Sequence, residues 1–184
     1  IGSVADGGFR SAGAGTLALN VANDFTGPVG AAGTSTLKQG VAGAFSDKAK
    51  MEGGTLDLNG IATAFSEIRG HGTIVGNATV SGVLELDGAL TFDGNLTLGS
   101  GTVVRMNVND DGSAADYLKV TGSLVCNGPV VFDFMREYDD VAVFGEFSSV
   151  IGEAGTISGF SARATNITRG RRYIVDVSAN NGRI

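Results

Sequence analysis

The chain has 184 residues, of which 42% are hydrophobic, so it can bury the core of one folded domain and is too apolar for a disordered segment. It contains 30 glycines but only 2 prolines, and 17% of its residues are charged, a composition that favours strands and tight turns over long helices. The net charge of −6 argues against a nucleic-acid-binding protein, because such proteins need a basic surface.

One short phrase recurs about every nineteen residues: a glycine, a small polar residue and then an alternating apolar and polar strand. It reads GTLALN, STLKQG, GGTLDLNG, GTIVGN and GVLELDG, starting at residues 15, 35, 53, 72 and 82. Such a period is typical of a solenoid, whose units bury their apolar faces by stacking. We therefore predict an all-β solenoid of parallel strands. An antiparallel meander is the alternative, because Asn59-Gly60, Asp87-Gly88 and similar pairs also favour hairpins.

In chain order, the alternation predicts strands from residue 15 onward, interrupted by a short helix or irregular loop at Val41–Met51 and a polar loop at Asn107–Asp116. Residues 1–133 are predicted to form the stacked rungs, and residues 134–184 an atypical C-terminal cap of the same domain. The residues predicted to point inward are Leu17, Leu19, Leu37, Leu56, Leu58, Ile74, Leu84, Leu86, Leu90, Phe92, Leu96, Leu98, Val104, Met106, Leu118, Val120 and Leu124.

The single histidine and the single cysteine are both predicted to be structural. His71 lies between glycines in RGHGT, and no Ser-His-Asp arrangement can be read around it, so we predict a solvated turn residue. Cys126 excludes an internal disulfide and alternates with Leu124, which predicts a buried, unreactive thiol.

Three aspartates, Asp110, Asp111 and Asp116, fall in the polar loop. Carboxylates bind Ca²⁺, but this spacing lacks both the EF-hand pattern and the glycine-rich nonapeptide repeat. We predict a solvated turn in which Asp116 caps the strand that follows, and we assign no metal site and no cofactor.

A second acidic group raises the alternative of glycoside hydrolysis by paired carboxylates. It consists of Glu137, Asp139 and Asp140. A β-helix enzyme of this kind would carry acidic and basic side chains in step on one face. We find no basic partner in step with the outward acidic residues of the repeats, and we assign no catalytic residue. Those outward residues are Asp57, Glu85, Asp87 and Asp93.

Two further groups of polar residues are interpreted as ordinary surface. Asn77, Asn95 and Asn166 each begin an Asn-x-Thr triplet, a glycosylation acceptor in eukaryotic secreted proteins. In a bacterial scaffold they are turn and outer-face residues. The basic cluster near the C-terminal end is predicted to be an exposed strand entry, with an anion-binding spot as the alternative. Its members are Arg169, Arg171 and Arg172.

Residues 13–60 resemble an autotransporter-associated β-strand repeat. In that family G-x-G-T-L-x-L is followed by an Asn-rich segment, an aromatic-Thr-Gly turn, a second G-T-L, an Ala-rich loop and G-G-x-L-D-L-N-G. The matching residues are Gly13, Gly15, Thr16, Leu17, Leu19, Asn20, Asn23, Phe25, Thr26, Gly27, Thr36, Leu37, Gly53, Gly54, Leu56, Asp57, Leu58, Asn59 and Gly60. Residues 90–131 resemble the next segment of such proteins, where an N-L-T-L strand leads through an Asp-rich loop to A-D-Y-L-K-V-T-G.

The resemblance implies a right-handed parallel β-helix displayed on, or released from, a Gram-negative-type cell envelope. Only one full repeat is clear, and no C-terminal membrane barrel follows in this sequence. The chain begins with Ile and shows no signal segment, so we expect a processed or truncated product.

We therefore expect a non-catalytic, extracellular structural or display module with no transmembrane segment. The alternatives are a glycan-binding adhesin, a polysaccharide-cleaving β-helix enzyme and a self-assembling filament subunit. The expected partners are surface glycans or a second copy of the chain, joined end to end through the N-terminal rung.

Overall fold

The structure, a computed structural model, describes residues 2–3, 7–108, 115–136, 151–159, 164–168 and 171–175; for residues 2–3, 136, 164–168 and 171–175 it describes the backbone only. The described residues form strands and turns and contain no helix. The all-β prediction is therefore confirmed. The strands are β1 (Gly2–Ser3), β2 (Phe9–Ser11), β3 (Ala14–Leu19), β4 (Val29–Ala32), β5 (Thr34–Gln39), β6 (Lys48–Asp57), β7 (Thr63–Val75), β8 (Ala78–Asp93), β9 (Leu96–Gly99), β10 (Val103–Val108), β11 (Tyr117–Asn127), β12 (Val131–Arg136), β13 (Gly152–Ser158), β14 (Ala164–Thr168) and β15 (Arg171–Val175).

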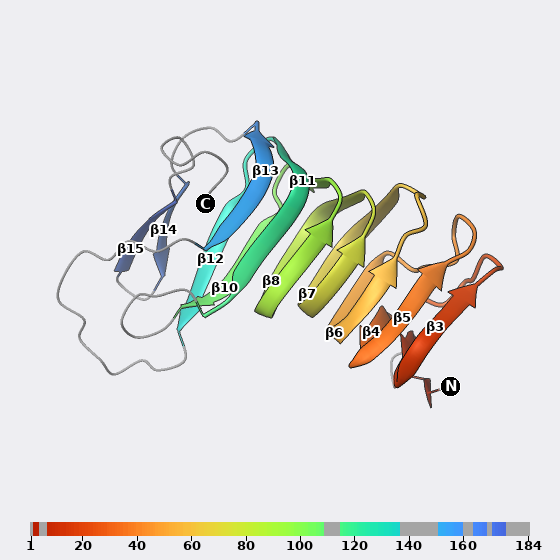
Figure 1. The fold of residues 1–184 in the computed structure, drawn as a ribbon. Coiled ribbons are helices and arrows are strands. Elements are labelled where there is room, and N and C mark those ends of the chain that lie inside the picture. The colour runs from red at the N-terminus through yellow and green to blue at the C-terminus, as the bar shows by residue number, and fades with distance from the viewer. Residues whose placement is uncertain are drawn as a thin grey trace.

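The strands pair in parallel with strands one repeat further along the chain. Strands β2 to β13 all join one sheet through parallel pairings, and Figure 1 shows them side by side along an elongated molecule. Among the described residues, antiparallel pairing is confined to β1 with β2 and to β14 with β15. This pattern excludes the antiparallel meander for the repeats.

The pairings form three ladders, because the long strands bend through corners. The first ladder contains β2, β4, the first part of β6, the middle parts of β7 and β8, β10 and β12. The second contains β3, β5 and the last parts of β6, β7 and β8, followed by the starts of β11 and β13. A third runs through the starts of β7 and β8 to β9 and the ends of β11 and β13.

Glycines make these corners. Gly88 lies inside β8 with a φ of 107°, so the Asp87-Gly88 pair bends a continuing strand and does not reverse it. At Gly70, whose φ is 103°, an added Cβ would overlap the carbonyl oxygen of Met51, its register partner in the neighbouring strand β6. Glycine is required there because two backbones approach closely.

The core consists of columns of apolar side chains that stack between the ladders. One column runs through Leu17, Leu37, Leu56, Ile74 and Phe92, which are successive register partners in the second ladder. Of the residues predicted to point inward, all but Leu17 and Leu19 are buried. Leu17 is 37% exposed, which corrects the prediction, and Leu19 is half-buried against the core. Both lie on β3, which among the described strands pairs with β5 alone.

Of the two alternatives predicted for Val41–Met51, the irregular loop holds for residues 41–47, whereas residues 48–51 belong to β6, which begins at Lys48. Ala44 and Phe45 are buried within that turn, so the apolar residues that suggested a helix face the core instead. Core residues Phe65, Ile68 and Val80 were also missed. The register shifts by one residue between Phe65 and Glu67, which interrupts the period-two alternation.

Candidate functional site: a charged ladder on one face

The first ladder carries charged side chains on its outer face. Because alternate residues of these strands enter the core, the intervening ones point outward and stack on their register partners. Arg69 pairs with Glu85, Glu85 with Arg105, and Arg105 with Asp133. Four consecutive positions of one column therefore alternate in charge.

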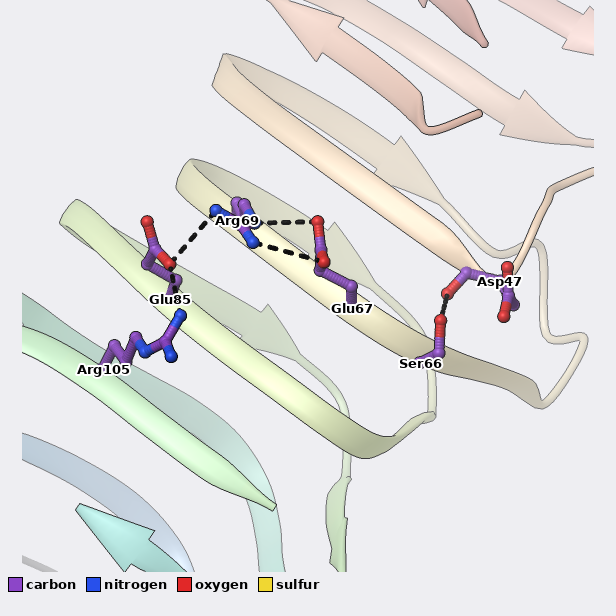
Figure 2. Close-up of polar contacts among 6 residues, drawn as sticks. All are labelled: Asp47, Ser66, Glu67, Arg69, Glu85 and Arg105. Atoms are coloured by element: carbon purple, nitrogen blue, oxygen red, sulfur yellow. Dashed lines mark hydrogen bonds and ion pairs between the residues drawn. The ribbon is translucent and has the colours of Figure 1, made fainter. Parts of the chain in front are cut away.

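These side chains contact one another across the strands, as Figure 2 shows for the part from Glu67 to Arg105. Arg69 donates from Nε to Glu67 Oε1 at 2.8 Å, and its Nη1 lies 3.3 Å from Glu85 Oε2. Arg105 Nη1 lies 3.4 Å from the same Glu85 oxygen, and Arg105 Nε lies 3.4 Å from Asp133 Oδ2. We call Glu67, Arg69, Glu85, Arg105 and Asp133 the charged ladder.

The sequence predicted no basic partner in step with the outward acidic residues. This is wrong for Glu85, which lies beside two arginines, Arg69 and Arg105. It is also wrong for Asp57, since Lys38 Nζ lies 3.5 Å from Asp57 Oδ2. Arg69, Glu85, Arg105 and Asp133 are separated by 16, 20 and 28 residues along the chain. A search at a fixed period of about nineteen residues cannot align such positions.

A second charged group lies on the same face. Glu52 Oε2 accepts a hydrogen bond from Arg10 Nη2, and Glu52 Oε1 lies 3.3 Å from Lys50 Nζ. Partial burial raises the pKa of Glu52, but the hydrogen bonds and positive charges of Lys50 and Arg10 outweigh it and lower the pKa below its ordinary value. The Glu52 carboxylate is thereby held in its ionised form.

Within the charged ladder, Arg69 also favours its ionised form. The hydrogen bond to Glu67 raises the pKa of Arg69, an effect opposed by desolvation and strengthened by the charges of Glu67 and Glu85. A general acid or base needs a pKa poised near the working pH. The shifts of Glu52 and Arg69 both move away from that range, and both side chains are held in ion pairs.

The single histidine and the single cysteine both lie within strands. His71 is exposed as predicted, but it lies within β7 and not in a turn. Cys126 is 4% exposed, which confirms that it is buried, and burial raises the pKa of its thiol to about 11, which disfavours the reactive thiolate.

Asp116 differs from the prediction of a solvated turn residue, because only 3% of it is exposed. Its Oδ1 accepts a 2.6 Å hydrogen bond from the backbone N–H of Gly88, and its Oδ2 accepts one of 2.6 Å from that of Asn107. Asp116 therefore caps neighbouring backbone groups within the stack, which occupies both oxygens.

Asn77 and Asn95 form a short polar stack at one corner. Asn77 Oδ1 accepts a hydrogen bond from the backbone N–H of Asn95 at 3.0 Å, and Asn95 Oδ1 accepts one from that of Ser123 at 2.8 Å. These carbonyl groups satisfy backbone donors where the chain turns. In the neighbouring corner, Ser66 Oγ donates to the backbone oxygen of Asp47 at 3.2 Å (Figure 2).

Several candidate residues lie outside the described part of the chain: Asp110, Asp111, Glu137, Asp139, Asp140 and Arg169. Asn166, Arg171 and Arg172 lie in β14 and β15, whose side chains are not described. Within the described residues, no group of three or more His, Cys, Asp or Glu side chains is placed to hold a metal ion.

Within the same residues, no helix occurs that is long and apolar enough to cross a bilayer. The comparisons with known proteins add no family: no protein-family model, no curated protein and no solved structure matches this chain.

Proposed function

We propose that this chain is a right-handed parallel β-helix that serves as a non-catalytic structural or display module at the outer surface of a Gram-negative-type bacterium. The observation that carries the proposal is the charged ladder, in which Arg69, Glu85, Arg105 and Asp133 alternate in charge across four paired strands. Cross-strand pairs of this kind specify register and stabilise stacking.

The β-helical architecture is supported by the columns of stacked side chains. Leu37, Leu56, Ile74 and Phe92 occupy the same core position in successive repeats. Such recurrence is typical of solenoids, in which each repeat is stabilised by contacts with its neighbours. Right-handedness is supported by the hand that crossover connections between parallel strands almost always take.

A scaffold role is supported by where the apolar and aromatic side chains lie. Binding surfaces draw on exposed aromatic anchors, whereas Phe65, Phe92 and Phe132 are buried and Phe9 and Phe25 pack against the core. The outer face of the first ladder therefore offers paired charges and no described phenylalanine as an anchor.

The location at the cell surface rests on the resemblance of residues 13–60 to autotransporter-associated repeats. It is tested by expressing the complete gene in its own bacterium and treating intact cells with protease. Loss of the protein from intact cells, with a periplasmic marker preserved, is the expected result. Protection of the protein until the outer membrane is opened would contradict the location.

The non-catalytic role is tested with the purified 184-residue chain and a panel of acidic and neutral polysaccharides. We expect neither turnover nor saturable binding. Turnover that is lost in Asp139→Asn or Asp140→Asn would establish a polysaccharide-cleaving enzyme instead. Saturable binding without turnover would establish an adhesin, and Arg105→Gln would then show whether the charged ladder provides the binding surface.

A further inference from the structure

Two of the three Asn-x-Thr triplets lie side by side at one corner of the stack. Asn77 and Asn95 immediately precede β8 and β9, and the third residues of the two triplets, Thr79 and Thr97, are register partners in these strands. In each triplet the middle residue is buried, whereas the asparagine is exposed and the threonine is partly exposed. Both triplets therefore present their asparagine and threonine outward, from strands that lie roughly 5 Å apart.

The side-chain amides of Asn77 and Asn95 have a fixed orientation. Each Oδ1 accepts a hydrogen bond from a backbone N–H one repeat further along the chain, that of Asn95 for Asn77 and that of Ser123 for Asn95. The Nδ2 atom lies on the other side of the planar amide, and within the described residues neither Nδ2 donates a hydrogen bond. Both Nδ2 atoms are therefore available to an external partner.

Two other asparagines use the amide differently. Asn23 Nδ2 donates to the backbone oxygen of Ala44 at 2.9 Å, and Asn107 Nδ2 donates to Asp116 Oδ2 at 3.0 Å. Neither of them begins an Asn-x-Thr triplet. In these two residues the nitrogen serves the fold, whereas in Asn77 and Asn95 only the oxygen does.

The neighbouring strand leaves room beside Asn77 and Thr79. Ala64 of β7 is the register partner of Thr79, and Ala62 lies two positions earlier, next to Asn77. Both alanines are exposed and have no side-chain atoms beyond Cβ. No long side chain of β7 therefore shields this pair from a bulky group.

We propose that Asn77 and Asn95 are acceptors for an N-linked sugar, transferred from a donor in which the sugar is activated by a diphosphate. Nδ2 attacks the anomeric carbon of the donor, so that a carbon–nitrogen bond forms. The bond from that carbon to the diphosphate oxygen breaks, and the diphosphate leaves with the electron pair. Nδ2 gives up one proton, and the threonine hydroxyl two residues later is the group that identifies the acceptor triplet.

The fold accommodates the product without losing a hydrogen bond. Glycosylation replaces one hydrogen of Nδ2 and leaves Oδ1 as an acceptor. The bonds from the N–H groups of Asn95 and Ser123 therefore persist. An N-linked glycan is a bulky, solubilising surface group, and at this corner it covers the outside of the stack and leaves the core unchanged.

The proposal goes beyond the scaffold role and is tested on protein purified from the cells that naturally make it. Trypsin releases residues 70–105 as one peptide, because no lysine or arginine lies between Arg69 and Arg105. We expect this peptide to carry sugar mass at Asn77 and Asn95, located by mass spectrometry with electron-transfer fragmentation. A single sugar at each site indicates a nucleotide-linked donor, and an oligosaccharide of constant mass indicates a lipid-linked donor. A peptide that carries only the mass of its own residues would overturn the proposal.

Threonine variants expressed in the same cells separate recognition of the triplet from mere exposure of an asparagine. Thr97→Val removes the hydroxyl but keeps Asn95 and its hydrogen bond, and it should abolish the sugar at Asn95, whereas Thr97→Ser should retain it. Asn127 is the matched control, because it is exposed but is followed two residues later by Pro129, and it should carry no sugar. Sugar that persists in Thr97→Val, or that also occurs on Asn127, would contradict a triplet-specific site. Circular dichroism confirms that each variant is folded.

Discussion

Leu58 illustrates how strongly a single position in a stacked core constrains the sequence. Its side chain is completely buried, its N–H donates to the carbonyl oxygen of Val75 at 2.9 Å, and the backbone of Gly76 lies against it. In a stack of repeats, each buried residue contributes to the interfaces with neighbouring repeats, so a change at Leu58 disturbs the packing between repeats.

We predict that Leu58→Asp lowers the free energy of unfolding by about 4 kcal/mol or more, because it buries a carboxylate without a partner. Leu17→Asp is the matched control: the same change at a 37% exposed leucine should cost less than about 1 kcal/mol. Urea denaturation of the two variants measures the difference. Equal destabilisation by the two variants would contradict the complete burial of Leu58 in the core.

Cys126 provides a second prediction at the residue scale. Burial raises the pKa of its thiol from 9.0 to about 11. The unfolded chain therefore loses this proton first, so the stabilisation is complete below pH 9.0 and is lost as the pH rises toward 11. We expect Cys126→Ala to flatten the decline of stability across that interval, measured by urea denaturation at a series of pH values.

At the scale of the strands, the charged ladder links β7, β8, β10 and β12 across their outer face. Each of its pairs is partly exposed, with side-chain exposures of 26% for Glu85 and 35% for Arg105. Exposed pairs contribute little individually, and networks contribute more. Their main effect here is on register, since a strand that slipped by one residue would separate the opposite charges and turn its core residues outward.

We predict that Arg105→Glu destabilises the fold by about 1–2 kcal/mol, because the new carboxylate lies between those of Glu85 and Asp133 and is repelled by both. Arg105→Gln, which only removes the charge, should cost less than about 1 kcal/mol. Thermal unfolding at low and high salt checks the cause. The difference in melting temperature between Arg105→Glu and Arg105→Gln should become smaller in about 1 M salt, where charges are screened. A gap that does not depend on salt would indicate lost packing of the arginine stem instead.

At the scale of the whole molecule, a stack of rungs is expected to open from its ends. Central residues such as Ile74 and Phe92 are fully buried between neighbours on both sides, whereas β5 is the only described strand that pairs with β3. Hydrogen exchange should therefore be slowest in β7 and β8 and fastest in β3. Uniform exchange along the chain would contradict a stack held by neighbour contacts.

Parts of the core and of the site could be predicted because they depend on local pattern. Leu56 and Leu58 alternate with polar residues, and the structure buries both. Phe65 and Ile68 escaped prediction because a shift in register interrupts the alternation between them. Asp116 was expected to be solvated, yet its burial depends on the N–H of Gly88, which lies 28 residues away in sequence.

The sequence by itself determined the all-β class, the stacking of repeats and most of the inward residues, because these depend on the two-residue period of a strand and on glycines at the corners. Only the tertiary structure decided which charges meet. The spacing from Arg69 to Glu85, Arg105 and Asp133 changes from rung to rung, so their alternation becomes visible only when the strands are placed in register. The structure likewise decided that Leu17 is exposed, because its side chain follows the inward pattern but no described strand stacks on its outer edge.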